Sequence, residues 1–171
     1  GYWEKPGFFA TADADDAEKR AETKRDRKTK PDFAWGWGEI VATKIQNGET
    51  NPYAVDTIAP PTENPWKRNV RLSGFDFFSD GRAAFCTFDG DIWLTSPIGT
   101  GTDVTWTRYA SGLNEPMALQ IVDDEIYVFG RTCIWKLRDE DGDGDADFYE
   151  NFSNLMGQTA ESREFPNDMV K

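Results

Sequence analysis

The stretch RDEDGDGDADFYE, residues 138–150, could bind a metal ion, because seven of its thirteen residues carry a carboxylate and Arg138 is its only cation. Within it, a twelve-residue window starting at residue 139 matches the pattern D-x-D-x-D-G-x5-E. Alternating aspartates turn several oxygens toward one point, and a final glutamate can contribute both of its oxygens to a hard cation. The pattern predicts Ca²⁺ as the cofactor, with these candidate ligands: Asp139, Asp141, Asp143, Asp145, Asp147 and Glu150.

The six candidates are not equivalent. Gly144 stands where such loops turn sharply, and the next position supplies its backbone carbonyl, so the Asp145 side chain is not required. Asp147 and Glu150 stand where the following strand is expected to begin, which makes the first three aspartates the stronger candidates. Like charges about 4 Å apart repel by about 1 kcal/mol even in water, so the loop should splay without a cation.

The alternative interpretation is a solvated acidic turn with no ion. The related stretch SPIGTGTDVTW, residues 96–106, illustrates it, because only Asp103 is kept there, in register with Asp145. The run CIWKLR before the acidic loop is strand-like, and no amphipathic helix surrounds the loop. A calcium loop between two strands is therefore predicted, rather than a helix–loop–helix site.

The elements that would position this loop are short strands. From Phe33 onward, runs rich in Val, Ile, Phe, Tyr and Trp alternate with turn residues, among them Asp-Gly pairs. The proline-rich stretch 59–65 is expected to be an extended crossing segment, because proline cannot donate to a sheet. Strands are predicted near residues 75–79, 82–88, 91–96, 105–110, 117–122, 125–130, 133–138 and 147–152.

An internal repeat organises these strands. A shift of 42 residues lays RAAFCTFDGDIWLTS (82–96) on DEIYVFGRTCIWKLR (124–138), so that Trp93 falls on Trp135. The same shift lays WTRYASGL (106–113) on FYENFSNL (148–155). A period of about 40–50 residues, divisible into four strands, is typical of β-propeller blades. A β-sandwich whose hairpins match by chance is the alternative.

The predicted fold class is all-β, with about two complete four-stranded blades of a larger propeller and an irregular N-terminal arm. Propellers usually close with about 4–8 blades. We therefore expect the remaining blades on a companion chain or in a missing continuation. The predicted divisions are a charged arm (1–32), an extended lead-in (33–66), blade 1 (67–114), blade 2 with the calcium loop (115–155) and the start of a third blade (156–171).

The charge is strongly negative, with 19 basic and 31 acidic residues and a net charge of −12. Such a field repels nucleic acid, so cations, neutral substrates or basic partners are favoured. No run of 18 apolar residues is present, so no membrane span is expected. The run 12–30 lacks large apolar side chains and is predicted to be a solvated arm or linker, or else a segment docking on an acidic partner.

Catalytic chemistry is hard to place in this sequence. It contains no histidine, which excludes a Ser-His-Asp triad and a Cys-x-x-Cys-His haem attachment within these residues. Asp76, Asp80, Asp89 and Asp91 are interpreted as turn residues, so no catalytic residue is assigned and the question of enzymatic activity stays open.

Tryptophans and cysteines have structural interpretations. Trp93 and Trp135 recur at one blade position and are expected to pack in the core, whereas Trp35, Trp37 and Trp66 are freer to contact a ligand such as carbohydrate. Cys86 and Cys133, the two cysteines of the chain, could form a disulfide between neighbouring blades or remain buried thiols. Asn151-Phe152-Ser153 matches the glycosylation sequon.

Residues 52–153 resemble a known family. The elements GFDFFSDG, GDIW, GL-EP and DGDG-AD-YE are similar to those of large exported bacterial propellers related to the sorbosone and glucose dehydrogenase propellers. These proteins often carry a c-type cytochrome domain in the same polypeptide. The resemblance implies a periplasmic or extracellular propeller with calcium at Asp139, Asp141 and Asp143. It also implies transfer of electrons from an oxidised sugar or alcohol to haem c in the parent protein.

The sequence departs from that family in three respects. The haem motif is absent, no histidine can serve as the base used by quinone-dependent relatives, and Arg163-Glu164-Phe165 stands where members tend to have His-Glu-Phe. An active centre would come mainly from other sequence, and haem c would bind elsewhere in the parent protein or on a partner cytochrome. The expected function is a calcium-binding propeller segment associated with cytochrome c electron transfer and sugar or alcohol oxidation. The alternative is a non-catalytic propeller that binds polysaccharide or a protein partner, with a purely structural calcium.

Overall fold

The computed structural model describes residues 39–48, 53–99, 101–156 and 168–170. Within these ranges the chain forms ten β-strands and no helix, which confirms the all-β prediction. It follows that no described helix is long and apolar enough to cross a membrane. The strands are β1 (Ile40–Gln46), β2 (Thr57–Ile58), β3 (Leu72–Phe77), β4 (Ala83–Thr87), β5 (Ile92–Thr95), β6 (Asp103–Ala110), β7 (Ala118–Val122), β8 (Glu125–Phe129), β9 (Ile134–Arg138) and β10 (Phe148–Ser153).

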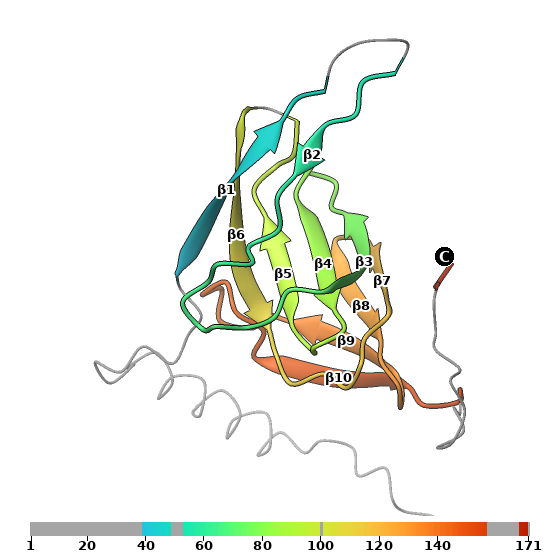
Figure 1. Cartoon of the computed structure of the whole chain (residues 1–171). Helices are drawn as coiled ribbons and strands as arrows, with labels where there is room; N and C mark the ends of the chain where they lie inside the picture. Colours follow the sequence, from blue (N-terminus) through green and yellow to red (C-terminus); the bar gives the residue numbers. More distant parts are fainter. Residues whose placement is uncertain (1–38, 49–52, 100, 157–167, 171) are drawn as a thin grey trace, which may run out of the picture. The chain divides into compact units, whose positions relative to one another are not determined.

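The strands form two curled antiparallel sheets (Figure 1). Sheet 1 has six strands in the order β2-β1-β6-β5-β4-β3, and sheet 2 has four in the order β10-β9-β8-β7. Each of the eight predicted strands overlaps one of β3 to β10. Within the predicted lead-in, β1 pairs with β6 and β2 pairs with β1, so sheet 1 has two strands more than the four expected.

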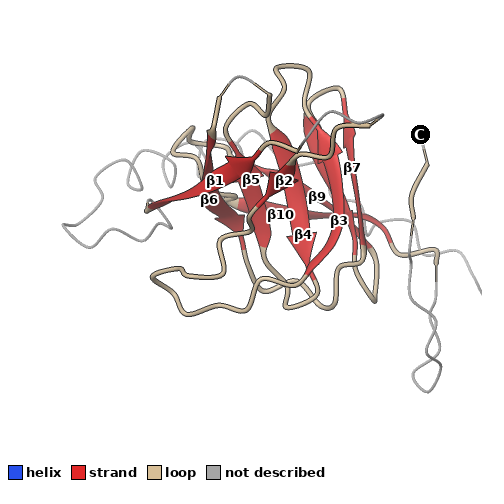
Figure 2. Ribbon diagram, turned by 45° about the horizontal axis from the view of Figure 1, so that its top comes forward, coloured by secondary structure: helices blue, strands red, loops and turns tan. Residues whose placement is uncertain are grey.

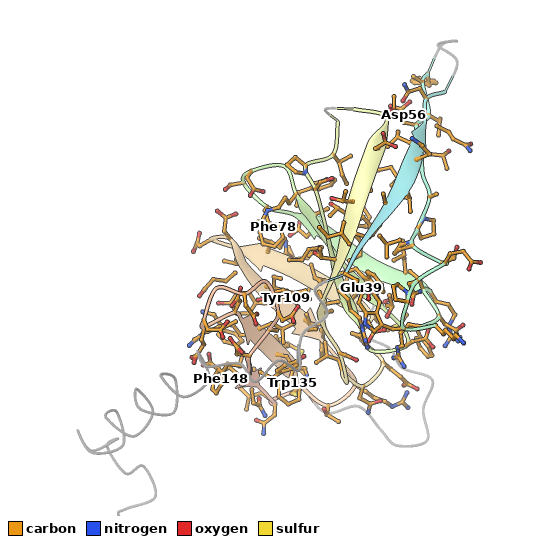
Figure 3. All side chains as sticks on the ribbon, turned by 90° about the vertical axis from the view of Figure 1, so that its left-hand side faces the viewer. Glu39, Asp56, Phe78, Tyr109, Trp135 and Phe148 are labelled. Carbon is orange, nitrogen blue, oxygen red and sulfur yellow. The ribbon has the colours of Figure 1, made fainter. Side chains whose placement is uncertain are left out.

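The main hydrophobic core lies between the two sheets. Sheet 1 contributes Ala84, Cys86, Ile92, Leu94 and Tyr109, and sheet 2 contributes Leu119, Ile126, Val128 and Leu137, with Trp135 packed against them. Strands buried on one face need this alternation of inward apolar residues. Figure 3 labels Phe78 and Tyr109, which belong to this core, and Trp135, which lies against it.

The opposite face of sheet 1 carries a second core. Trp93, Val104 and Trp106 are its buried members, and Trp66 and Val70 of the preceding segment pack against them. The rings of Trp66 and Trp93 meet edge to face, 5.7 Å between centroids. The segment before β3 therefore covers part of this sheet face, and Trp66 is a packing residue rather than a free platform for a ligand.

Strands β3 and β7 hold the two sheets together and lie side by side (Figure 2). The Asp76 carboxylate accepts hydrogen bonds from the Ile121 backbone N–H (2.7 Å) and from the Gln120 side-chain amide (3.1 Å). Gly74 lets the backbones approach, because a Cβ atom there would lie 3.0 Å from the Met117 carbonyl oxygen. One carboxylate and one glycine thus fix the spacing of these two strands.

The repeat is present in the structure, but its register changes at one turn. Trp93 pairs with Phe85, whereas Trp135 pairs with Val128. The offset is therefore 42 residues from β5 to β9 and 43 residues from β4 to β8. The gapless shift of 42 residues is wrong by one residue for β8, because the β8–β9 turn is one residue shorter than the β4–β5 turn.

The same correction applies to the last strand of each repeat. Trp93 pairs with Arg108 and Trp135 pairs with Asn151, so the offset from β6 to β10 is also 43 residues. A β-bulge follows at the same place in both strands. The match of Ser111 with Ser153 is therefore wrong by one residue, although the two repeats share the same strand order.

Several predictions concern residues outside the described ranges. The charged arm (1–32), Trp35, Trp37 and Arg163-Glu164-Phe165 all lie there. From the predicted start of a third blade, residues 168–170 are described, and Met169 packs against Ala118, Phe129 and Ile134 on the second face of sheet 2.

Candidate metal centre

Three carboxylates of the acidic loop converge on one point. Asp139, Asp141 and Asp147 each place an oxygen so that all three atoms lie within 4.8 Å of one another. Asp139 follows β9 directly and Asp147 precedes β10 directly, so the two strands bring the ends of the loop together. All three side chains are half-buried, which makes their mutual repulsion stronger than it is in water.

Backbone N–H groups hold the three carboxylates in place. Asp139 accepts from Gly142 (2.7 Å) and Gly144 (2.9 Å), and Asp147 accepts from Glu140 (2.9 Å) and Asp141 (3.2 Å). The Asp141 carboxylate accepts from Asp143 (3.2 Å). A carboxylate has about four lone-pair positions. Each oxygen of Asp139 accepts one of these bonds and therefore keeps a lone pair that a cation could use.

Two glycines give the loop its shape. Gly142 has φ +78° and Gly144 has φ +95°, and a Cβ atom at either position would meet nothing within 4 Å. Glycine is required there by backbone conformation rather than by space. Gly144 was expected from the sequence pattern, whereas Gly142 is an additional left-handed position that the pattern does not specify.

The loop is attached to the other sheet. The Ala146 backbone N–H donates to the Tyr109 carbonyl oxygen of β6 (2.7 Å), and Ala146 packs against the core between the sheets. Burial and then the negative charge of Asp139 raise the pKa of the Tyr109 phenol well above its usual range. An ion in this loop would therefore stabilise a contact between the sheets as well as the loop itself.

The other three predicted ligands lie apart from the converging group. Asp143 accepts from the Asp145 backbone N–H at 3.0 Å and is not one of the three converging residues. Asp145 also stands outside that group, as expected for the position whose carbonyl is used. Glu150 lies on β10 and forms an ion pair with Arg138, across the β9–β10 pair. The structure thus brings Asp147 into the site and directs Glu150 elsewhere.

The described residues of the equivalent loop in the first repeat form no comparable group. Asp103 begins β6 and forms an ion pair with Lys44 at 2.5 Å. The hydrogen bond from Lys44 lowers the pKa of Asp103. Among the described residues, the loop after β9 is the one place where three potential ligand side chains converge.

A cleft opens beside the loop, between the two sheets. Its volume is about 390 Å³. Its lining combines apolar side chains from both sheets with two arginines and three acids, among them Asp139. Arg82 is paired with Asp80, and Arg138 with Glu150, so both guanidinium groups already have acidic partners. The lining offers no nucleophile paired with a base.

The strongest buried charge network was not expected from the sequence. Asp91 is completely buried and accepts from Arg68 (2.8 Å) and Arg108 (2.7 Å), although it had been interpreted as a turn residue. Arg108 lies on β6, whereas Arg68 comes from the segment before β3. A single Asp-Gly-Asp turn gives no signal that separates a solvated carboxylate from a buried one.

Both cysteines, and the two tryptophans that recur in the repeat, pack in the interior. Cys86 and Cys133 are both buried free thiols and do not form a disulfide. Burial raises the pKa of the Cys86 thiol, so a reactive thiolate is disfavoured there. Trp93 is fully buried, and Trp135 packs against the core between the sheets, which confirms the packing role expected for both.

Comparison with known proteins adds no assignment. No family model matches the chain, and neither a curated protein nor a solved structure is significantly similar to it.

Proposed function

We propose that this chain is a two-blade segment of a β-propeller in which the loop between β9 and β10 binds Ca²⁺. The observation that carries the calcium proposal is the convergence of Asp139, Asp141 and Asp147 within 4.8 Å. An oxygen-only ligand set suits a hard cation, and the loop spacing is that of calcium loops. The ion would neutralise the loop and secure its attachment to Tyr109.

The arrangement of the sheets supports the propeller part of this proposal. Sheet 1 contacts sheet 2 with the face opposite to the one that carries Trp93. Sheet 2 contacts sheet 1 with the face that carries Trp135. Two repeats that contact each other through unlike faces follow one another head to tail, as the blades of a propeller do. A sandwich built by pairing like faces would place Trp93 and Trp135 in the same core, and they lie in different ones.

Met169 gives further support. It covers Ala118, Phe129 and Ile134 on the second face of sheet 2. By the strand registers, Phe129 and Ile134 correspond to Cys86 and Ile92, which sheet 2 covers on sheet 1. A chain segment after β10 thus packs on the face of sheet 2 that a third blade would cover.

Calcium is expected to stabilise the fold. At a free Ca²⁺ concentration a hundredfold above Kd, binding adds about 2.7 kcal/mol to the free energy of unfolding. For a domain of this size, that gain corresponds to a rise in Tm of roughly 5–10 °C. Thermal unfolding with Ca²⁺ and with a chelator measures it, and equal melting temperatures would argue against a tight site.

Matched variants locate the ligands. Asp139→Asn is expected to abolish the calcium-dependent rise in Tm, because it removes the charge of one of the three converging carboxylates. Asp143→Asn, which makes the same exchange of an oxygen for an NH2 group in an acid outside that group, should retain the rise. Loss of the calcium effect in both variants would show that Asp143 is also a ligand, as the sequence pattern predicts.

The wider role that we propose comes from the family resemblance: an exported propeller working with a c-type cytochrome in sugar or alcohol oxidation. Protein isolated from its natural source is expected to show the reduced-minus-oxidised absorption band of haem c, and the band should appear on adding substrate sugar or alcohol. A preparation without haem that is retained on a polysaccharide array would favour the non-catalytic alternative.

A further inference from the structure

Two phenylalanines form an exposed apolar surface on β3. Phe75 and Phe77 are 59% and 49% exposed, and their rings meet at right angles with 5.9 Å between centroids. Phe75 also stacks on Phe85, 5.6 Å away, which places the pair on the sheet face that carries Trp93. We call Phe75 and Phe77 the β3 aromatic pair.

The repeat shows what normally covers this position. Phe75 pairs with Phe85, which pairs with Trp93; in sheet 2, Leu119 pairs with Val128, which pairs with Trp135. Leu119 is therefore the equivalent of Phe75, and Ile121, two residues along the strand, is the equivalent of Phe77. Leu119 is only 6% exposed because sheet 1 packs on it.

The segment before β3 covers only part of the face. Trp66 and Val70 pack on Trp93, toward the middle of sheet 1. The β3 aromatic pair at the edge of the sheet stays exposed. A partner that covers this surface must therefore contact β3 directly. In the contact between the two sheets, β3 makes the same kind of contact with β7.

A second copy of the chain is a poor occupant. It would have to offer the second face of sheet 2. On that face Ala118, Phe129 and Ile134 are already buried, with exposed fractions of 5%, 8% and 8%, and Met169 packs against them. Ala118 stands where sheet 1 has Gly74, so the close strand approach that glycine allows there is lost.

We propose that the β3 aromatic pair is the docking surface for a further four-stranded blade, supplied by polypeptide outside these 171 residues. This inference rests on the proposed propeller. The incoming blade would present small side chains where sheet 1 has Ala84 and Cys86. It would also carry an acid at the place of Asp76.

The acid has a specific acceptor role. Asp76 accepts from the Ile121 N–H at 2.7 Å, across the contact between the sheets. The equivalent N–H on β3 belongs to Phe77 and now donates to Asp76 of its own strand at 2.8 Å. The incoming carboxylate would take over the Phe77 N–H as the blade covers the ring.

Carbene footprinting with mass spectrometry tests the proposal without a mutation. The isolated chain and the protein from its natural source are labelled side by side in calcium. Labelling of Phe75 is expected to fall about tenfold in the natural protein, the ratio of the exposed fractions of Phe75 and its equivalent Leu119. Tyr53, 83% exposed and away from this surface, should be labelled equally in both samples.

The outcomes separate this inference from the proposed function. Equal labelling of the β3 aromatic pair in both samples, with Leu119 protected, overturns the docking surface and leaves the two-blade contact intact. Labelling of Leu119 would overturn the blade packing itself. Protection of the pair in the isolated chain, together with a dimer mass by light scattering, would identify a second copy as the occupant and also overturn the proposal.

Discussion

Replacing Asp91 with alanine is expected to lower the free energy of unfolding by about 3–5 kcal/mol, the cost of breaking a buried ion pair from one side. Asp91 is fully buried, and the Arg108 side chain is 5% exposed. Removal of the carboxylate leaves that guanidinium in the interior, where water cannot reach it. Urea unfolding monitored by tryptophan fluorescence measures the change.

Asp89, two residues earlier, provides the control. It forms an ion pair with Arg71, whose side chain is 62% exposed. Since such surface pairs contribute about 0–1 kcal/mol, Asp89→Ala should change the stability little. Similar losses in the two variants would show that Asp91 contributes no more than a surface pair. Arg68→Ala should cost less than Asp91→Ala, because Asp91 then keeps Arg108 as a buried partner and no buried charge is left alone.

Substitution of Gly90 by alanine is the second change with a large expected effect. Gly90 has φ +96°, and a Cβ atom there would lie 2.2 Å from the Leu113 carbonyl oxygen. Left-handed backbone costs about 1–2 kcal/mol and overpacking about 1–3 kcal/mol, so a loss of about 2–5 kcal/mol is expected. Chemical denaturation measures it.

The variant Gly112→Ala is a control that separates the conformational cost of the substitution from its steric cost. The φ of Gly112 is +86°, yet a Cβ atom there would meet nothing within 4 Å. Gly112→Ala should therefore show only the conformational cost, about 1–2 kcal/mol. If both variants lose the same stability, the contact with Leu113 relaxes at no cost and the steric part of the prediction is wrong.

The strands could be predicted because their signals are local. Alternating apolar residues and Asp-Gly turns located β3 to β10 to within a few residues, and the recurrence of Trp93 and Trp135 identified the repeat. The pairing of β1 with β6 could not be predicted in the same way. It joins residues more than fifty positions apart, and nothing in IVATKIQ specifies its partner strand.

The site was predictable in composition and less so in geometry. Spacing alone identified the loop, but it could not show that Arg138 would pair with Glu150 and that Asp147 would lie with Asp139. Cross-strand pairing decides both, because β9 and β10 place residues 138 and 150 on neighbouring positions. Asp91 is a similar case, since its partners come from distant segments.

The shorter turn after β8 shows where this repeat tolerates change in length. One residue is lost between β8 and β9, and Trp135 still faces the interior as Trp93 does. The deleted residue lies in a turn, where side chains do not have to alternate between the two faces of the sheet. A deletion inside a strand would instead move every later side chain of that strand to the opposite face. Copies of such a unit can therefore diverge by insertion and deletion at their turns while their buried surfaces are inherited unchanged.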